Sequence, residues 1–146
     1  MRENLLRKSV VARKGVKSQT NMTENEIAKI IVDCCYKIHT TLGPGLLESV
    51  YEEVLCYELA KRELNFVRQK GIPVIYENIK MDLGFRADIV VENKVIVEIK
   101  SIEQIAPVHP KILLTYLRLI NLKLGLMVNF NSALIKDGIQ RIVNNL

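Results

Sequence analysis

The sequence has 146 residues, no tryptophan, few aromatic residues and only three cysteines. No apolar run approaches the roughly 20 residues that a membrane-spanning helix needs, so we expect no membrane segment. The N-terminus lacks the apolar stretch of a secretory signal. Cys34, Cys35 and Cys56 are odd in number and form no CxxC motif. We therefore expect buried, reduced thiols in a cytoplasmic protein, without disulfides or a cysteine-bound metal.

Positive charge is gathered at one end of the chain. Residues 1–22 hold six basic residues and one acid, which accounts for the whole net charge of +5. We expect a basic, disordered tail over residues 1–22 and a single domain over residues 23–146. That domain is neutral and shows no recognisable nucleic-acid-binding module, although a basic tail can bind nucleic acid without sequence preference.

Periodicity and chain breakers predict an alternation of helices and strands. Thr23 and Glu26 form a capping box at the start of the first helix, and Gly43 and Gly45 flank a proline that separates it from the second. Gly84 is expected at a bulge, and Glu52, Glu53 and Glu58 as solvated charges. The predicted helices cover residues 23–41, 46–64 and 110–121, and the predicted strands cover residues 72–77, 82–92, 95–100, 124–130 and 139–144. This pattern predicts an α/β fold, with a mixed sheet flanked by helices in the order ααβββαββ.

The most informative stretch is residues 85–100, which read FRADIVVENKVIVEIK. Two runs rich in valine and isoleucine flank a short polar break, a pattern that favours a β-hairpin. One face of this hairpin is expected to be wholly apolar. It comprises Ala87, Ile89, Val91, Val95, Val97 and Ile99.

The register of the hairpin decides where Asp88 points. A two-residue loop would set Asp88 opposite Val97, and a three-residue loop over residues 92–94 would set it opposite Glu98. A slip of one residue moves every side chain to the other face. We predict the three-residue loop, which gathers Asp88, Glu98 and Lys100 on one face.

Two interpretations of this charged cluster compete. In the first, the hairpin lies at an edge of the sheet and its polar face meets water. In the second, the near-continuous apolar runs indicate strands covered on both sides, where a charge must be paired or must hold a metal. Carboxylate oxygens suit Mg²⁺, and a lysine two residues further on can orient a water or offset developing phosphate charge.

Asp88 followed by Glu98, Ile99 and Lys100 resembles the D…ExK signature of the PD-(D/E)XK nuclease superfamily. Residues 45–51, GLLESVY, resemble the GxxExxY motif of one small family within it, and a YLR…LGLMVNF segment follows the hairpin. The resemblance runs from about Asn25 to the C-terminus. It implies a restriction-endonuclease-like core.

The resemblance also implies the members of an active site. Asp88, Glu98 and Glu48, with the Ile99 carbonyl, would hold Mg²⁺ or Mn²⁺, and Lys100 would help to activate water. Tyr51 and Tyr116 would support the site. We expect a metal-dependent nuclease acting on nucleic acid, as a homodimer or with a partner protein because the domain is small.

One position departs from the family pattern. Relatives tend to carry a glutamine four residues before the tyrosine of YLR, and here that residue is Ile112. The metal ligands are unaffected, but efficient catalysis is in question. The alternative is a non-catalytic module that binds protein or nucleic acid and keeps the nuclease fold. Another polar residue near this position, His109, precedes the crossover helix. We expect it to act as a helix cap or a surface residue and not as a member of the active site.

Overall fold

A computed structural model describes residues 21–146, apart from the side chains of residues 82 and 83. The tail predicted over residues 1–22 therefore lies outside the described residues, except for its last two positions. The elements are α2 (Glu24–Leu42), α3 (Glu48–Lys61), β1 (Phe66–Tyr76), β2 (Ile79–Val91), β3 (Val95–Lys100), α4 (Val108–Ile120), β4 (Leu124–Asn129), α5 (Ile135–Gly138) and β5 (Ile139–Val143).

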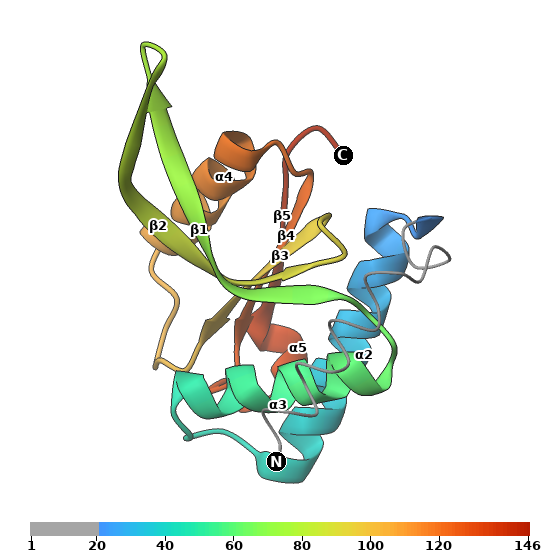
Figure 1. Cartoon of the computed structure of the whole chain (residues 1–146). Coiled ribbons are helices and arrows are strands. Elements are labelled where there is room, and N and C mark those ends of the chain that lie inside the picture. The colour runs from blue at the N-terminus through green and yellow to red at the C-terminus, as the bar shows by residue number, and fades with distance from the viewer. Residues whose placement is uncertain (1–20) are drawn as a thin grey trace.

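The strands form one five-stranded sheet in the order β1-β2-β3-β4-β5 (Figure 1). β3 and β4 run parallel, joined by the α4 crossover, and the other neighbouring pairs are antiparallel. The α/β class, the mixed sheet and the succession of the main elements are as predicted. The only helical turn between β4 and β5 is the short α5, also as predicted.

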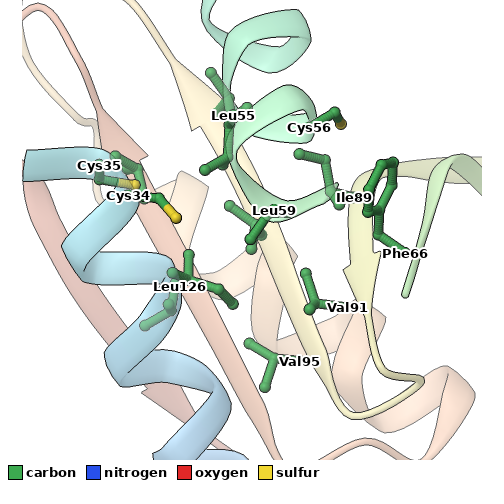
Figure 2. Packing of buried hydrophobic residues seen from close by; sticks show 14 of the residues in the cluster. Cys34, Cys35, Leu55, Cys56, Leu59, Phe66, Ile89, Val91, Val95 and Leu126 are labelled. Carbon is green, nitrogen blue, oxygen red and sulfur yellow. The ribbon is translucent and has the colours of Figure 1, made fainter. Parts of the chain in front are cut away.

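Helices cover both faces of the sheet. Side chains of α2 and α3 pack on one face in a large apolar cluster, and side chains of α4 form a smaller cluster on the other. Figure 2 shows Leu55 and Leu59 of α3 facing the sheet, where Ile89 and Val91 lie in the same cluster. Coverage on both faces is why β3 and β4 are almost continuously apolar.

The helix boundaries follow local chemistry. Thr23 and Glu26 form the predicted capping box at the start of α2, and Gly43 ends that helix with a positive φ of +70°. Cys34, Cys35 and Cys56 are buried and free, as predicted. Burial raises the pKa of the Cys34 thiol to about 11 and that of Cys56 to about 12. No helix within residues 21–146 has the length and apolarity needed to cross a membrane.

The first strand begins earlier than the predicted residue 72. β1 starts at Phe66, which is buried and pairs with Val91. The alternation is interrupted at Gln69, whose φ of +48° is left-handed. Because residues 68–71 are polar or glycine, the sequence pattern indicated a connection and not the first half of a strand.

β1 and β2 extend past the rest of the sheet as an arm, which we define as residues 74–81 (Figure 1). At its base the register shifts, with Ile72 opposite Phe85 and Val74 opposite Met81. Gly84 lies in this irregularity, as predicted. A side chain there could not fit, because a Cβ atom would lie 2.4 Å from the Ile72 carbonyl oxygen.

Candidate active site

The β2–β3 hairpin has the predicted register. Val91 pairs with Val95 and Ile89 with Val97 around a three-residue loop, and Glu92 and Asn93 adopt the left-handed φ values that this turn needs. The ladder of paired residues ends at Ile89. Asp88 is the next residue of β2 and falls opposite Glu98.

Side chains replace the backbone ladder at this point. The Asp88 amide donates to Glu98 Oε1 at 3.1 Å, and the Ile99 amide donates to Asp88 Oδ2 at 2.8 Å. Each carboxylate is therefore fixed by a backbone N–H of the opposite strand. The predicted meeting of Asp88 and Glu98 is confirmed.

The predicted apolar face is wrong at one position. Ile89, Val91, Val95, Val97 and Ile99 pack in the cluster beneath α2 and α3, whereas Ala87 packs in the cluster beneath α4. The strand thus changes face at Asp88, where no backbone pair is formed on the side of β3. The change brings a charged side chain to the boundary between the two apolar layers.

Burial and like charge act together on the two carboxylates. Burial, followed by the charge of Asp88, raises the pKa of Glu98 to about 8. Burial also raises the pKa of Asp88, against the opposing effect of the hydrogen bond from Ile99. The Lys100 ammonium favours the ionised form of both groups but does not cancel the increase. Such crowding is relieved by a proton or by a cation.

A cavity of about 300 Å³ opens between α3 and the hairpin. It brings Glu48 of α3 to the same space as Asp88 and Ile99. The Glu48 side chain is exposed at the start of its helix and accepts a hydrogen bond from the Ser101 amide at 3.3 Å. The lining residues are Glu48, Ser49, Glu52, Gln69, Asp88 and Ile99.

The three predicted carboxylates are brought together only in pairs. Asp88 meets Glu98 through the hydrogen bond described above, and Asp88 shares the cavity with Glu48, but Glu98 is not among the lining residues. Within residues 21–146, no group of three or more aspartate, glutamate, histidine or cysteine side chains is close enough to hold a metal ion.

The two tyrosines lie on opposite sides of the sheet. Tyr116 of α4 is nearly buried, and its pKa is raised by burial and then by the charges of Glu98 and Asp88, so it lies near the site. Tyr51 is fully buried and stacks on Phe130 at 4.4 Å between ring centroids. Its hydroxyl donates to the Gly43 carbonyl at 2.5 Å and accepts from the Leu46 amide at 3.2 Å, which fixes the loop that leads to Glu48.

Three glutamates of α3 depart from the prediction of solvated charges. Glu52 and Glu58 are buried and Glu53 is partly buried. Arg68 binds Glu52 and Glu53, and Lys37 lies 3.1 Å from Glu58. These partners are distant in sequence, so local pattern gave no sign of them. Glu52 was nevertheless detectable as a site neighbour, because it is one helical turn after Glu48 and shares its face.

Two further residues complete the surroundings. Ile112, at the position where relatives tend to have glutamine, is partly exposed on α4 and does not line the cavity. His109 lies in the first turn of α4 and not before the helix as predicted, and its Nδ1 atom accepts a hydrogen bond from the Ala106 amide of the preceding loop at 3.0 Å. Gln69 was placed in a connection by the sequence pattern but reaches the cavity from within β1.

Opposed carboxylates where the hairpin ladder ends, with a lysine two residues after one of them, are the arrangement that the D…ExK resemblance implies. Comparison with family models agrees. The model for the PD-(D/E)XK nuclease superfamily matches residues 25–142, and the chain belongs to this superfamily. No curated protein and no solved structure matches the chain. Membership of the narrower GxxExxY family remains a prediction from the motif at residues 45–51.

Proposed function

We propose that the protein is a divalent-metal-dependent nuclease that hydrolyses phosphodiester bonds in nucleic acid. The observation that carries the proposal is the meeting of Asp88 and Glu98 at the end of the hairpin ladder, beside Lys100. Membership of the superfamily indicates a nuclease-like function, and PD-(D/E)XK nucleases generally use divalent metals.

The chemistry of the donors fits Mg²⁺ or Mn²⁺. Asp88, Glu98 and Glu48, with the Ile99 carbonyl, offer only oxygen atoms, which these hard cations prefer. Burial, followed by the charge of Asp88, raises the pKa of Glu98, and burial raises that of Asp88, so a bound cation would favour the ionised form of both. A bound cation would lower the pKa of a water and neutralise charge on the phosphate.

Lys100 would act on the same phosphate from the end of β3. It is partly buried, and its charge acts on both Asp88 and Glu98. An ammonium at this position can donate hydrogen bonds to an attacking water and offset the negative charge that develops on the phosphate. Glu48 would approach the cation from the α3 side of the cavity. The Ser101 amide donates a hydrogen bond to its carboxylate.

Cleavage of labelled DNA and RNA, single- and double-stranded, with Mg²⁺ or Mn²⁺ tests the proposal. We expect cleavage by the wild type that EDTA prevents, and its loss in Lys100→Ala with metal binding retained. Lys111→Ala, which removes an exposed lysine from α4, is the matched control and should cleave normally. Metal binding without cleavage of any of these substrates would contradict the nuclease proposal.

A non-catalytic binding module is the second candidate. Ile112 favours it, because an apolar side chain stands where relatives tend to have a polar one. Titration calorimetry separates the two candidates. A nuclease requires a competent Mg²⁺ or Mn²⁺ site, whereas a binding module does not. Absence of heat on titration of either cation into the wild type would favour the module.

We also propose that the protein is a cytoplasmic homodimer. The arm supports dimerisation, because Ile75, Tyr76 and Ile79 are each about three-fifths exposed on a two-stranded ribbon. Such ribbons are only marginally stable in water without further packing. A second copy would cover these side chains and help a small domain to hold its substrate. The three buried, free thiols support a reducing compartment.

A further inference from the structure

Gln69 has an unusual backbone conformation for its place in the fold. Among residues 21–146, it is the only non-glycine residue with positive φ inside a strand, since the others lie in turns or at element ends. Glutamine has no intrinsic preference for the left-handed region, unlike glycine and asparagine. Strain of this kind tends to collect at functional sites, where surrounding contacts hold it in place.

The strained residue lies beside Asp88. Arg68 pairs with Ile89 and Lys70 with Ala87, so Gln69 falls opposite Asp88, where β2 changes face. The Gln69 carbonyl accepts a hydrogen bond from Arg86 at 3.2 Å, and its side chain reaches the cavity between α3 and the hairpin. The left-handed turn therefore directs an amide toward the carboxylates.

The Gln69 amide joins two carboxylates. Its Nε2 atom donates to Glu52 Oε1 at 2.8 Å and to Asp88 Oδ1 at 3.4 Å. Both partners accept and neither donates when ionised, so the amide must present its NH₂ group to them. One side chain thus uses two N–H groups to fix the distance between α3 and β2 at the site.

Glu52 is itself anchored by the guanidinium group of Arg68. Its Oε2 atom accepts from Arg68 Nε at 3.2 Å and from a terminal guanidinium nitrogen at 3.0 Å. The same guanidinium also binds Glu53 at 2.8 Å. Because Glu52 is nearly buried and its two oxygens are engaged by Arg68 and Gln69, it acts as a fixed support.

Asp88 is held at both oxygens as a result. The Ile99 amide binds Oδ2, and Gln69 binds Oδ1. Each carboxylate oxygen has a further lone pair. The two hydrogen bonds therefore leave Asp88 able to bind a cation in the cavity. Groups that orient a ligating carboxylate in this way raise metal affinity although they do not touch the metal.

We propose that Gln69, supported by Glu52 and Arg68, is a positioning residue that fixes the Asp88 carboxylate for divalent-cation binding. The inference rests on the proposed metal-dependent function and adds to it a residue outside the D…ExK and GxxExxY motifs. The positive φ of Gln69 is then explained, because this backbone conformation directs the side-chain amide to Asp88.

Two substitutions separate the amide from the backbone strain. Gln69→Gly adopts a positive φ freely and removes the amide, and Gln69→Asn tolerates that φ but is too short by one methylene to span both carboxylates. We expect both variants to melt close to the wild-type temperature, because the relieved backbone strain offsets the lost hydrogen bond to Glu52. We also expect each to bind Mn²⁺ about 10-fold or more weakly in titration calorimetry, as is typical when a supporting group is lost.

Gln140→Gly and Gln140→Asn are the matched controls, because Gln140 is an exposed glutamine in the edge strand β5. The glycine control should lower the melting temperature, and both controls should bind Mn²⁺ as the wild type does. A purely structural role for Gln69 predicts the opposite pattern, with lower melting temperatures and unchanged affinity.

The possible failures are distinguishable. If the wild type binds Mn²⁺ and both Gln69 variants bind it within twofold, the role of Gln69 is wrong and the proposed function stands. If the wild type binds neither Mn²⁺ nor Mg²⁺, the metal-dependent function and the inference fail together. Gln69 variants that do not fold would show a structural role and would also overturn the inference.

Discussion

Asp88 and Ile99 are linked by a hydrogen bond of 2.8 Å from the Ile99 amide to the Asp88 carboxylate, next to the last backbone pair of the hairpin. The Asp88 side chain of β2 thus takes the place of a backbone carbonyl and continues the hydrogen bonding to β3. This arrangement ties the orientation of Asp88 to the backbone of β3 at Ile99, the residue before Lys100.

Asp88→Asn tests whether the carboxylate serves a cation or the fold. Asparagine keeps an oxygen that can accept from Ile99 and loses only the acceptor of the longer bond from Gln69 at 3.4 Å, while the repulsion with Glu98 is removed. We expect the metal-free variant to be as stable as the wild type or more so. In the wild type, a hundredfold excess of Mg²⁺ or Mn²⁺ over its Kd should add about 2.7 kcal/mol of stability, and the variant should gain none. Thermal melts with EDTA or added metal measure both effects.

A structural ion pair between Asp88 and Lys100 predicts the reverse result. Asparagine would then destabilise the protein, and metal would have no effect on the wild type. Glu103→Gln, which neutralises an exposed glutamate in the loop after β3, is the control for general charge effects.

The raised pKa of Glu98 predicts that metal-free protein loses stability as pH rises. The folded-state pKa of about 8 lies above the ordinary 4.5, so the folded state holds this proton more tightly than the unfolded state does. The resulting stabilisation is fully present below about pH 4.5 and is lost as pH increases to about 8. The slope cannot exceed about 1.4 kcal/mol per pH unit for one group.

Urea unfolding in EDTA between pH 5.5 and 8 measures this dependence. Glu98→Gln should flatten it, because the amide does not titrate. A wild-type stability that rises over this interval would contradict the proton-binding role of Glu98.

Tyr51→Phe should destabilise the fold without affecting the apolar stacking on Phe130. The hydroxyl joins the Gly43 carbonyl to the Leu46 amide, and its loss removes both of these part-buried hydrogen bonds. We expect a loss of about 1–3 kcal/mol in the free energy of unfolding. Tyr57→Phe on the same helix is the control, because Tyr57 contacts Lys61 through its ring. Equal effects of the two substitutions would contradict a special role for the Tyr51 hydroxyl.

The arm provides the test of dimerisation. Ile79→Lys places a charge among the exposed apolar side chains, and we expect it to shift a wild-type dimer to monomer in sedimentation equilibrium. Leu134→Lys is the control, because Leu134 is about equally exposed before α5. A wild type that is monomeric at tens of micromolar would show that the homodimer proposal is wrong.

Local pattern was sufficient to predict the hairpin at the centre of the site. Val91 and Val95 pair as predicted because the three polar residues between them form the turn and the apolar runs leave one register that buries them. The same reasoning correctly placed Glu98 opposite Asp88. These relationships depend on residues close together in sequence.

Long-range pairing accounts for the errors. Glu52 was predicted to be solvated because its partner Arg68 lies in another element, 16 residues away. The first half of β1 was missed because residues 68–71 are polar or glycine, and Arg68 and Gln69 meet their glutamate partners only in the folded protein. Neither feature has a local signature, since each is stabilised by contacts that form only when α3 meets the sheet.

The three buried cysteines make the protein convenient for spectroscopy. Cys34, Cys35 and Cys56 are the only cysteines in the sequence, all are buried, and burial raises the pKa of each thiol. The thiolate is the nucleophile that attacks an alkylating reagent, so these side chains should remain unmodified in the folded state at neutral pH. A cysteine introduced at an exposed position of the arm would therefore be the single labelling site in an otherwise native sequence, and would allow a dye or spin label to report its surroundings.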